Sequence, residues 1–180
     1  MAGLQGGRSD ITKSSVMKAR ADPTTVETGI DGPNRALLID GLASVLGDRC
    51  VLQFKTRVAS WNVVGPLFLG LHDLMARQGQ ELFIAVDGLA RRMRSLGFPV
   101  PERLSAIVER SELVEEEGIV RGSAEDMIAQ LATDHEAVAR NIRTVATWAK
   151  QLKDQVTFNL LADQRMISAE TIYRTYDAAA

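Results

Sequence analysis

A chain of 180 residues in which 46% of the side chains are apolar is long enough for one domain with a complete core, and an aromatic content of only 5% favours helices packed through aliphatic side chains. The formal net charge of −2 excludes a protein whose surface as a whole binds nucleic acid. The single cysteine, Cys50, excludes an internal disulfide and a multi-cysteine metal site, and we expect it on a buried helix face. No apolar run approaches the roughly 20 residues that cross a bilayer, and the N-terminus lacks the apolar segment of a signal peptide. The sequence therefore predicts a cytoplasmic protein with no membrane partner.

The first segment, residues 1–33, is rich in Gly, Ser, Thr, Asp and Pro, and this composition predicts a flexible N-terminal arm. The arm is mildly basic, because its first 22 residues contain four basic side chains and only two acidic ones, Asp10 and Asp22. The four are the candidate DNA-binding residues Arg8, Lys13, Lys18 and Arg20. A turn over residues 31–34 then precedes the first helix, with Asn34 as the expected N-cap.

Residues 34–180 carry apolar side chains at helical spacing, which predicts one all-α domain. The first helix is expected over Arg35–Asn62 and the second from about Leu67 to Leu96. Glycines and prolines, which break helices, follow each of them. These breakers are Gly65, Pro66, Gly97, Pro99 and Pro101.

The connection after the second long helix is expected to hold a short helix, Glu102–Glu112, and an acidic loop, Ser111–Gly122. Ser123 then caps the third helix, with Asp126 completing a short-armed capping box. Asp154 or a close neighbour begins the fourth helix. Its expected inward side chains are Val156, Leu160, Leu161, Ile167, Ile172 and Tyr173. Four long helices with one short helix in a long middle connection predict a four-helix bundle.

Residues 55–74 read KTRVASWNVVGPLFLGLHDL. This stretch resembles the KTRxxHWNVxGPxFxxLHxL signature of the Dps miniferritins, the ferritin-like proteins that protect DNA during starvation. The resemblance extends from Arg35 to about Tyr176 and includes the run DQVT at residues 154–157. It implies a ferritin-like bundle with a free-standing short helix and a hollow cage of twelve chains. It also implies a role in iron storage, iron homeostasis and DNA protection under stress.

The resemblance also implies the positions of an iron-oxidation site between two subunits. In the family, one subunit supplies a histidine at the end of the first helix, then a histidine and an acid on the second, and its two-fold neighbour supplies two carboxylates. On this chain the positions are Ser60, His72, Ala76, Asp87 and Arg91. Asp87 follows His72 by fifteen residues, about 22 Å of helix, so a two-fold partner must bring the two ends together.

The substitutions at these positions predict that the site is largely lost. Ser60 is a poor ligand for iron, and Ala76 supplies none. Arg91 is a permanent cation four residues from Asp87, where it can pair with that carboxylate and repel Fe²⁺. We therefore expect iron to bind weakly at His72 and Asp87, its oxidation there to be absent or very slow, and no metal to be required for folding. For His72 we favour a hydrogen-bonded structural role over metal binding.

Other functions stay open at this point. An active ferroxidase that uses hydrogen peroxide would need a residual or displaced ligand set, for which Asp73 and Glu81 are the candidates. DNA binding would depend on the arm, because a cage with twelve arms multiplies weak contacts, and would make the protein nucleoid-associated. The sequence does not decide whether the chain co-assembles with an active paralogue.

Three acids in the C-terminal half are candidates for lining a negative three-fold pore of the kind the family has. They are Asp134, Glu136 and Asp154. The alternative is an exposed acidic helix face. His135, in a run that resembles the family's DHE pattern, is interpreted as structural or pore-adjacent, and Trp61 as packed in the core or at an interface.

Overall fold

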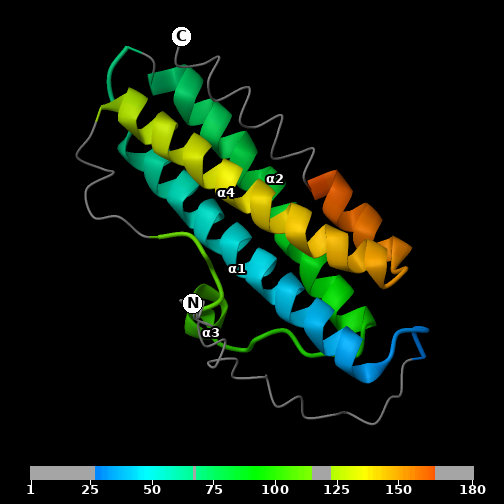
Figure 1. Cartoon of the computed structure of the whole chain (residues 1–180). Coiled ribbons are helices and arrows are strands. Elements are labelled where there is room, and N and C mark those ends of the chain that lie inside the picture. Colours follow the sequence, from blue (N-terminus) through cyan, green and yellow to red (C-terminus); the bar gives the residue numbers. More distant parts are fainter. Residues whose placement is uncertain (1–26, 67, 115–122, 165–180) are drawn as a thin grey trace, which may run out of the picture.

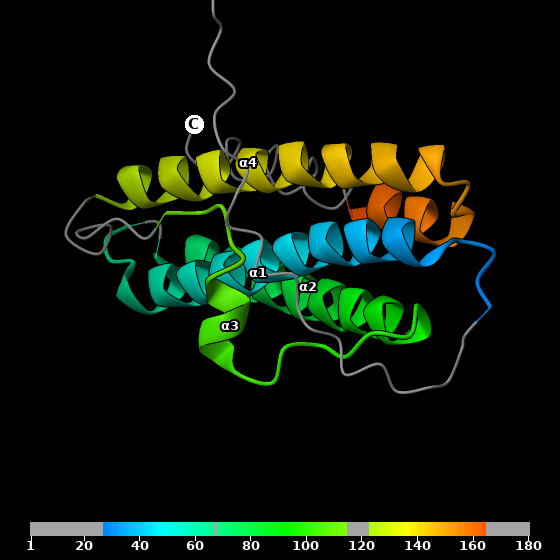
Figure 2. The same cartoon turned by 60° about the horizontal axis from the view of Figure 1, so that its bottom comes forward.

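The structure, a computed structural model, describes residues 27–66, 68–114 and 123–164. Three long helices run side by side: α1 (Gly32–Asn62), α2 (Phe68–Ser95) and α4 (Ala124–Gln151) (Figure 1). A further helical stretch spans residues 155–164. The short helix α3 (Leu104–Val108) lies across α1 in the connection between α2 and α4 (Figure 2). No strand occurs in these described ranges, so the predicted all-α bundle with a short helix in its middle connection is confirmed.

Several predictions from the sequence lie outside the described residues. They are the N-terminal arm up to residue 26, most of the acidic loop (residues 115–122), and the inward positions Ile167, Ile172 and Tyr173. The division into an arm over residues 1–33 and a bundle over 34–180 therefore stays a prediction.

The first helix begins three residues earlier than expected. Its N-cap is Asp31 rather than Asn34, and the Asp31 carboxylate accepts a hydrogen bond of 3.0 Å from the backbone N–H of Asn34. This hydrogen bond and a second one from the Asn34 side chain hold the pKa of Asp31 below its ordinary value. Pro33 does not end the helix, because a proline in the first turn gives up no helical hydrogen bond.

The second helix ends as its glycine predicts. Gly97 has φ +90°, and its N–H donates to the carbonyl of Arg94 while that of Phe98 donates to Met93, which together form a Schellman motif. The following short helix is shorter than the predicted Glu102–Glu112. It stops at Val108, because the backbone that follows turns toward α1, where the Glu112 N–H donates to the Asp48 carboxylate.

The capping box of α4 is confirmed, with Ser123 and Asp126 exchanging side-chain and backbone hydrogen bonds. Asp154 directly precedes the last helical stretch and caps it, because its carboxylate accepts from the Thr157 N–H at 3.0 Å. The prediction that Val156 points inward is wrong, because its side chain is 63% exposed. Thr157 is the buried residue, and Val156 lies about 100° away from it around the helix.

The core fills the space between α1, α2, α4 and the last helical stretch with aliphatic side chains. Its fully buried members include Leu38, Leu42, Leu46, Leu52, Leu82, Leu89, Met93, Val138, Ile142 and Leu161. Each such side chain contributes about 1.5–3 kcal/mol by leaving water. Cys50 packs against this core but is only partly buried. Within the described ranges, no helix combines the length and the apolar character needed to span a bilayer.

Candidate metal centre

The turn between α1 and α2 brings Ser60 and His72 together. Gly65, with φ +102°, and Pro66 reverse the chain, so that the end of α1 faces the second turn of α2. The Nδ1 atom of His72 lies 3.1 Å from the backbone oxygen of Ser60 and 3.2 Å from its hydroxyl oxygen. Because a carbonyl oxygen can only accept, Nδ1 carries the proton of the neutral ring and Nε2 keeps its lone pair. His72 therefore has the predicted hydrogen-bonded role and still keeps one ligand atom.

The rest of this end of the site supplies no further ligand. Ser60 is 2% exposed, with its hydroxyl turned toward His72. The Phe68 ring stacks on the imidazole, with ring centroids 5.5 Å apart. Ala76, one turn after His72 on the same face of α2, is exposed and ends in a methyl group.

At the far end of α2, Arg91 pairs with Asp87. A guanidinium nitrogen lies 2.7 Å from a carboxylate oxygen of Asp87, one helical turn away, and both side chains are more than half exposed. The expected contact between these two residues is thus confirmed. An exposed pair of this kind adds little stability. The ion pair instead affects metal binding, because the Asp87 carboxylate that could hold iron already contacts the positive charge of Arg91.

The displaced ligand set is not brought together on this chain. Asp73 is exposed next to His72, whereas Glu81 has one carboxylate oxygen buried. Glu81 follows His72 by nine residues, which is two and a half helical turns. The Glu81 side chain therefore points to the opposite side of α2. Among the described residues, no group of three or more His, Cys, Asp or Glu side chains could hold a metal ion. The positions present do not fit an iron site within one chain.

Two of the three candidate pore acids are held inside the chain. Asp134 is buried and pairs with Lys55 of α1 at 2.5 Å. Asp154 is 6% exposed and pairs with Arg92 of α2 at 2.7 Å. Burial raises the pKa of Asp154, but hydrogen bonds from Thr157 and Arg92 outweigh it and leave that pKa below its ordinary value. The alternative of an exposed acidic face is therefore wrong for both residues.

The side chain of the third candidate, Glu136, is 46% exposed, and its carboxylate lies 4.0 Å from the guanidinium of Arg140. A pore lined by these acids stays a prediction. Trp61 is 64% exposed, which excludes the core for this side chain and leaves the interface interpretation.

The family model for the ferritin-like domain matches residues 39–172. The chain belongs to the ferritin-like family. It is 33% identical over 138 residues to an uncharacterized low temperature-induced protein of Nostoc sp., and the match covers 76% of each protein. It is 28% identical over 111 residues to a DNA protection during starvation protein of Brevibacillus brevis, which covers 62% of this chain and 73% of that one.

Solved structures support the same fold. The Dps structure from Thermosynechococcus elongatus superposes with a TM-score of 0.77 at 22% identity, covering 82% of this chain and 93% of the other. The sequence relatives and this fold together confirm the resemblance to the Dps miniferritins.

The centre of this miniferritin bundle holds two buried ionisable side chains, Arg49 and His135, and the sequence interpretation singled out only His135. Arg49 of α1 is 0% exposed and donates to the backbone oxygen of Gln164 at 2.7 Å. Burial lowers the pKa of Arg49 to about 10, so it remains a cation at neutral pH. His135 of α4 is 1% exposed, and neither ring nitrogen has a hydrogen-bond partner among the described residues. Burial and the charge of Arg49 lower the pKa of His135 to about 3.

This miniferritin is therefore expected to lose stability in mild acid through His135. The unfolded histidine takes up a proton below about pH 6.5, whereas the folded one stays neutral down to about pH 3. Between pH 6.5 and 4.5 the free energy of unfolding should fall by about 1.4 kcal/mol per pH unit. Urea denaturation over that range measures the slope. His135→Leu should remove it, and His72→Leu should keep it; an unchanged slope in His135→Leu would contradict the assignment.

Proposed function

We propose that this chain forms a Dps-like cage that stores iron and protects DNA, and that its inherited site between subunits has largely lost iron oxidation. The ion pair between Asp87 and Arg91 carries the proposal. Of the five family positions, only the Nε2 atom of His72 and this paired carboxylate could bind iron. Two weak donors from different subunits leave most of the coordination of Fe²⁺ to water. Iron is then cargo of the cage rather than a substrate turned over quickly at this site.

The outward face of α2 supports assembly. Phe83 lies on the same face of α2 as His72, Ala76 and Asp87. Its spacings from these residues are eleven, seven and four, each close to a whole number of helical turns. Its side chain is 57% exposed in the single chain, and the neighbouring Ile84 is 62% exposed. A large apolar side chain beside the candidate metal positions favours a second copy covering this face. Such a partner would also bring the two halves of the family site together.

Light scattering on the full-length protein tests the assembly. We expect a closed oligomer, with twelve chains as the family resemblance implies. Phe83→Glu should shift the population toward dimers or monomers, because it places a charge inside the covered face. Thr147→Glu, at an exposed position of α4, is the matched control. A stable monomer in the unmodified protein would overturn both the cage and any metal site between subunits.

DNA protection would act through the N-terminal arm, whose basic residues are Arg8, Lys13, Lys18 and Arg20. One arm neutralises few phosphates, and many arms on one cage would add their weak contacts. The alternative, an active ferroxidase using hydrogen peroxide, is addressed by the oxidation assays below.

A further inference from the structure

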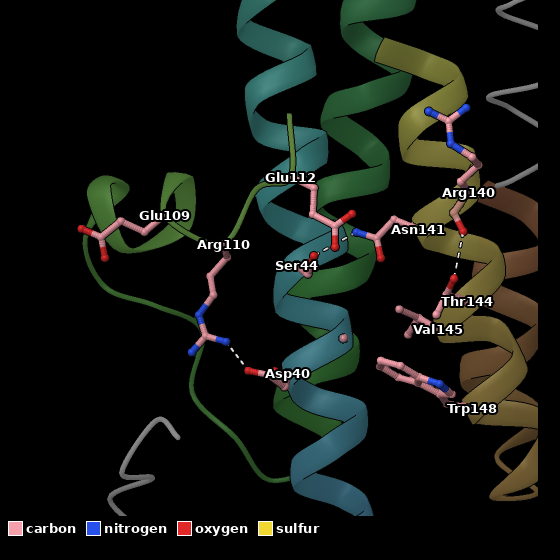
Figure 3. A pocket seen from close by; sticks show the side chains of 11 residues that line it. Asp40, Ser44, Glu109, Arg110, Glu112, Arg140, Asn141, Thr144, Val145 and Trp148 are labelled. Carbon is pink, nitrogen blue, oxygen red and sulfur yellow. Dashed lines mark hydrogen bonds and ion pairs between the residues drawn. The ribbon is translucent and has the colours of Figure 1, made fainter. Parts of the chain in front are cut away.

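A surface hollow of about 560 Å³ lies between α1, α4 and the segment that follows α3, residues 109–112 (Figure 3). Its floor is apolar and consists of Gly41, Val145 and Trp148. The volume falls within the about 300–1,000 Å³ of small-molecule sites. Gly41 precedes Ser60 by nineteen residues, or about 28 Å along α1, and no α2 residue lines the hollow. It is therefore separate from the candidate metal positions.

The floor of the hollow is closely packed. A Cβ atom on Gly41 would lie 2.9 Å from the ring of Trp148 and 3.0 Å from Val145, so only glycine allows α1 and α4 to approach this closely here. The indole of Trp148 is held against α1 on one side and is only half-buried, which leaves part of the ring facing the hollow (Figure 3).

The opposite wall is fixed by Asp48, which is buried. Its carboxylate accepts from the Ser111 hydroxyl at 2.9 Å, the Glu112 N–H at 2.7 Å and the Asn141 amide at 2.6 Å. Gly47 permits this contact, because a Cβ there would lie 2.7 Å from a backbone oxygen of α3. These contacts hold the backbone of residues 111–112 against α1 and α4, so a ligand would find this wall already in place.

Two carboxylates of the hollow, those of Glu109 and Glu112, form no ion pair with any residue that the structure describes, and the Glu109 side chain points away from the floor (Figure 3). Asp40 pairs with Arg110, and Arg140 extends along α4 away from the floor (Figure 3). Glu112 lies between α1 and α4 (Figure 3). The hollow thus presents an aromatic ring, an aliphatic surface and the carboxylate of Glu112, an exposed residue that has no ion pair among the described residues.

We propose that this hollow binds a small organic cation, with an amine or guanidinium group attached to an aromatic or aliphatic body. The cation would lie between the Glu112 carboxylate and the Trp148 ring, where a charge-assisted hydrogen bond and a cation–π contact act together. The aromatic or aliphatic body of the ligand would pack on the Val145 side chain. The Glu112 carboxylate would repel an anion, and a neutral ligand would gain no charge-assisted hydrogen bond from it.

Calorimetric titration of the full-length oligomer with phenethylamine tests the ligand class. Phenethyl alcohol and 3-phenylpropionate have a similar body but no positive charge. We expect the amine to bind and both analogues to bind at least about tenfold more weakly. No binding of the amine up to about 10 mM, or equal affinity for the alcohol, would overturn the proposal.

Two variants test the residues. Glu112→Gln and Trp148→Leu should each weaken binding of the amine about tenfold. Glu109→Gln is the matched control, because Glu109 borders the hollow but points away from it (Figure 3), and it should change the affinity less than about twofold. If Trp148→Leu unfolds the protein, Glu112→Gln alone decides. An equal effect of Glu109→Gln and Glu112→Gln would contradict the assignment.

Discussion

The triple variant Ser60→His, Ala76→Asp, Arg91→Glu is expected to oxidise Fe²⁺ with hydrogen peroxide at least about tenfold faster than the unmodified protein. Ser60 already faces His72 across the turn, so a histidine there would place a second imidazole beside it. Aspartate at position 76 adds a carboxylate one turn from His72. Glutamate at position 91 removes the cation that now pairs with Asp87. Stopped-flow absorbance of ferric products measures the rate.

The double variant Ser60→His, Ala76→Asp is the matched control, because it keeps Arg91 and its ion pair with Asp87. We expect it to remain much slower than the triple variant. If both variants oxidise iron equally fast, Arg91 does not block the site. If the triple variant is no faster than the unmodified protein, the two halves of the site do not meet in the assembly.

Lys55→Met is expected to lower the free energy of unfolding by about 3–5 kcal/mol. It removes one partner of a buried ion pair and leaves the Asp134 carboxylate in the core without its counter-charge. Lys55 also donates to the backbone oxygen of Val114 at 3.2 Å, so the variant releases the segment that leads from α3 toward α4. Urea denaturation followed by circular dichroism measures the loss.

Two controls separate charge from packing. Lys55→Met combined with Asp134→Leu should recover much of the loss, because it removes the unpaired carboxylate as well. Arg140→Met breaks an exposed contact of 4.0 Å with Glu136 and should cost less than about 1 kcal/mol. A loss for Lys55→Met no larger than that of Arg140→Met would show that the buried pair adds no stability.

Helix positions could be predicted from the sequence because periodicity and breakers act locally. Gly65-Pro66, Gly97 and the pair Ser123 and Asp126 all set helix ends in the structure. The start of α1 could not be predicted to the residue, since Asp31 and Asn34 both suit an N-cap and the geometry of the first turn decides between them. The end of the short helix could not be predicted, because it depends on a contact with Asp48, more than fifty residues earlier in the chain.

The candidate site could be predicted where one helix carries both partners. Arg91 and Asp87 are four residues apart, so helical spacing alone implies their contact. The partners of Asp134 and Asp154 lie on other helices, and no local pattern connects them to Lys55 or Arg92. The sequence did indicate the burial of Arg49, because Arg49 is three residues from both Leu46 and Leu52 and so lies on the buried face of α1. A charge at such a position indicates a buried interaction.

Iron oxidation by the unmodified protein tests the central proposal most directly. Purified oligomer is mixed with anaerobic Fe²⁺ and then with hydrogen peroxide, and ferric absorbance is followed by stopped flow against buffer alone. The degenerate site predicts a rate equal to that of buffer, or only slightly above it, and no change in His72→Ala. Rapid oxidation that His72→Ala abolishes would contradict the proposal and would require a ligand set other than the one described for this chain.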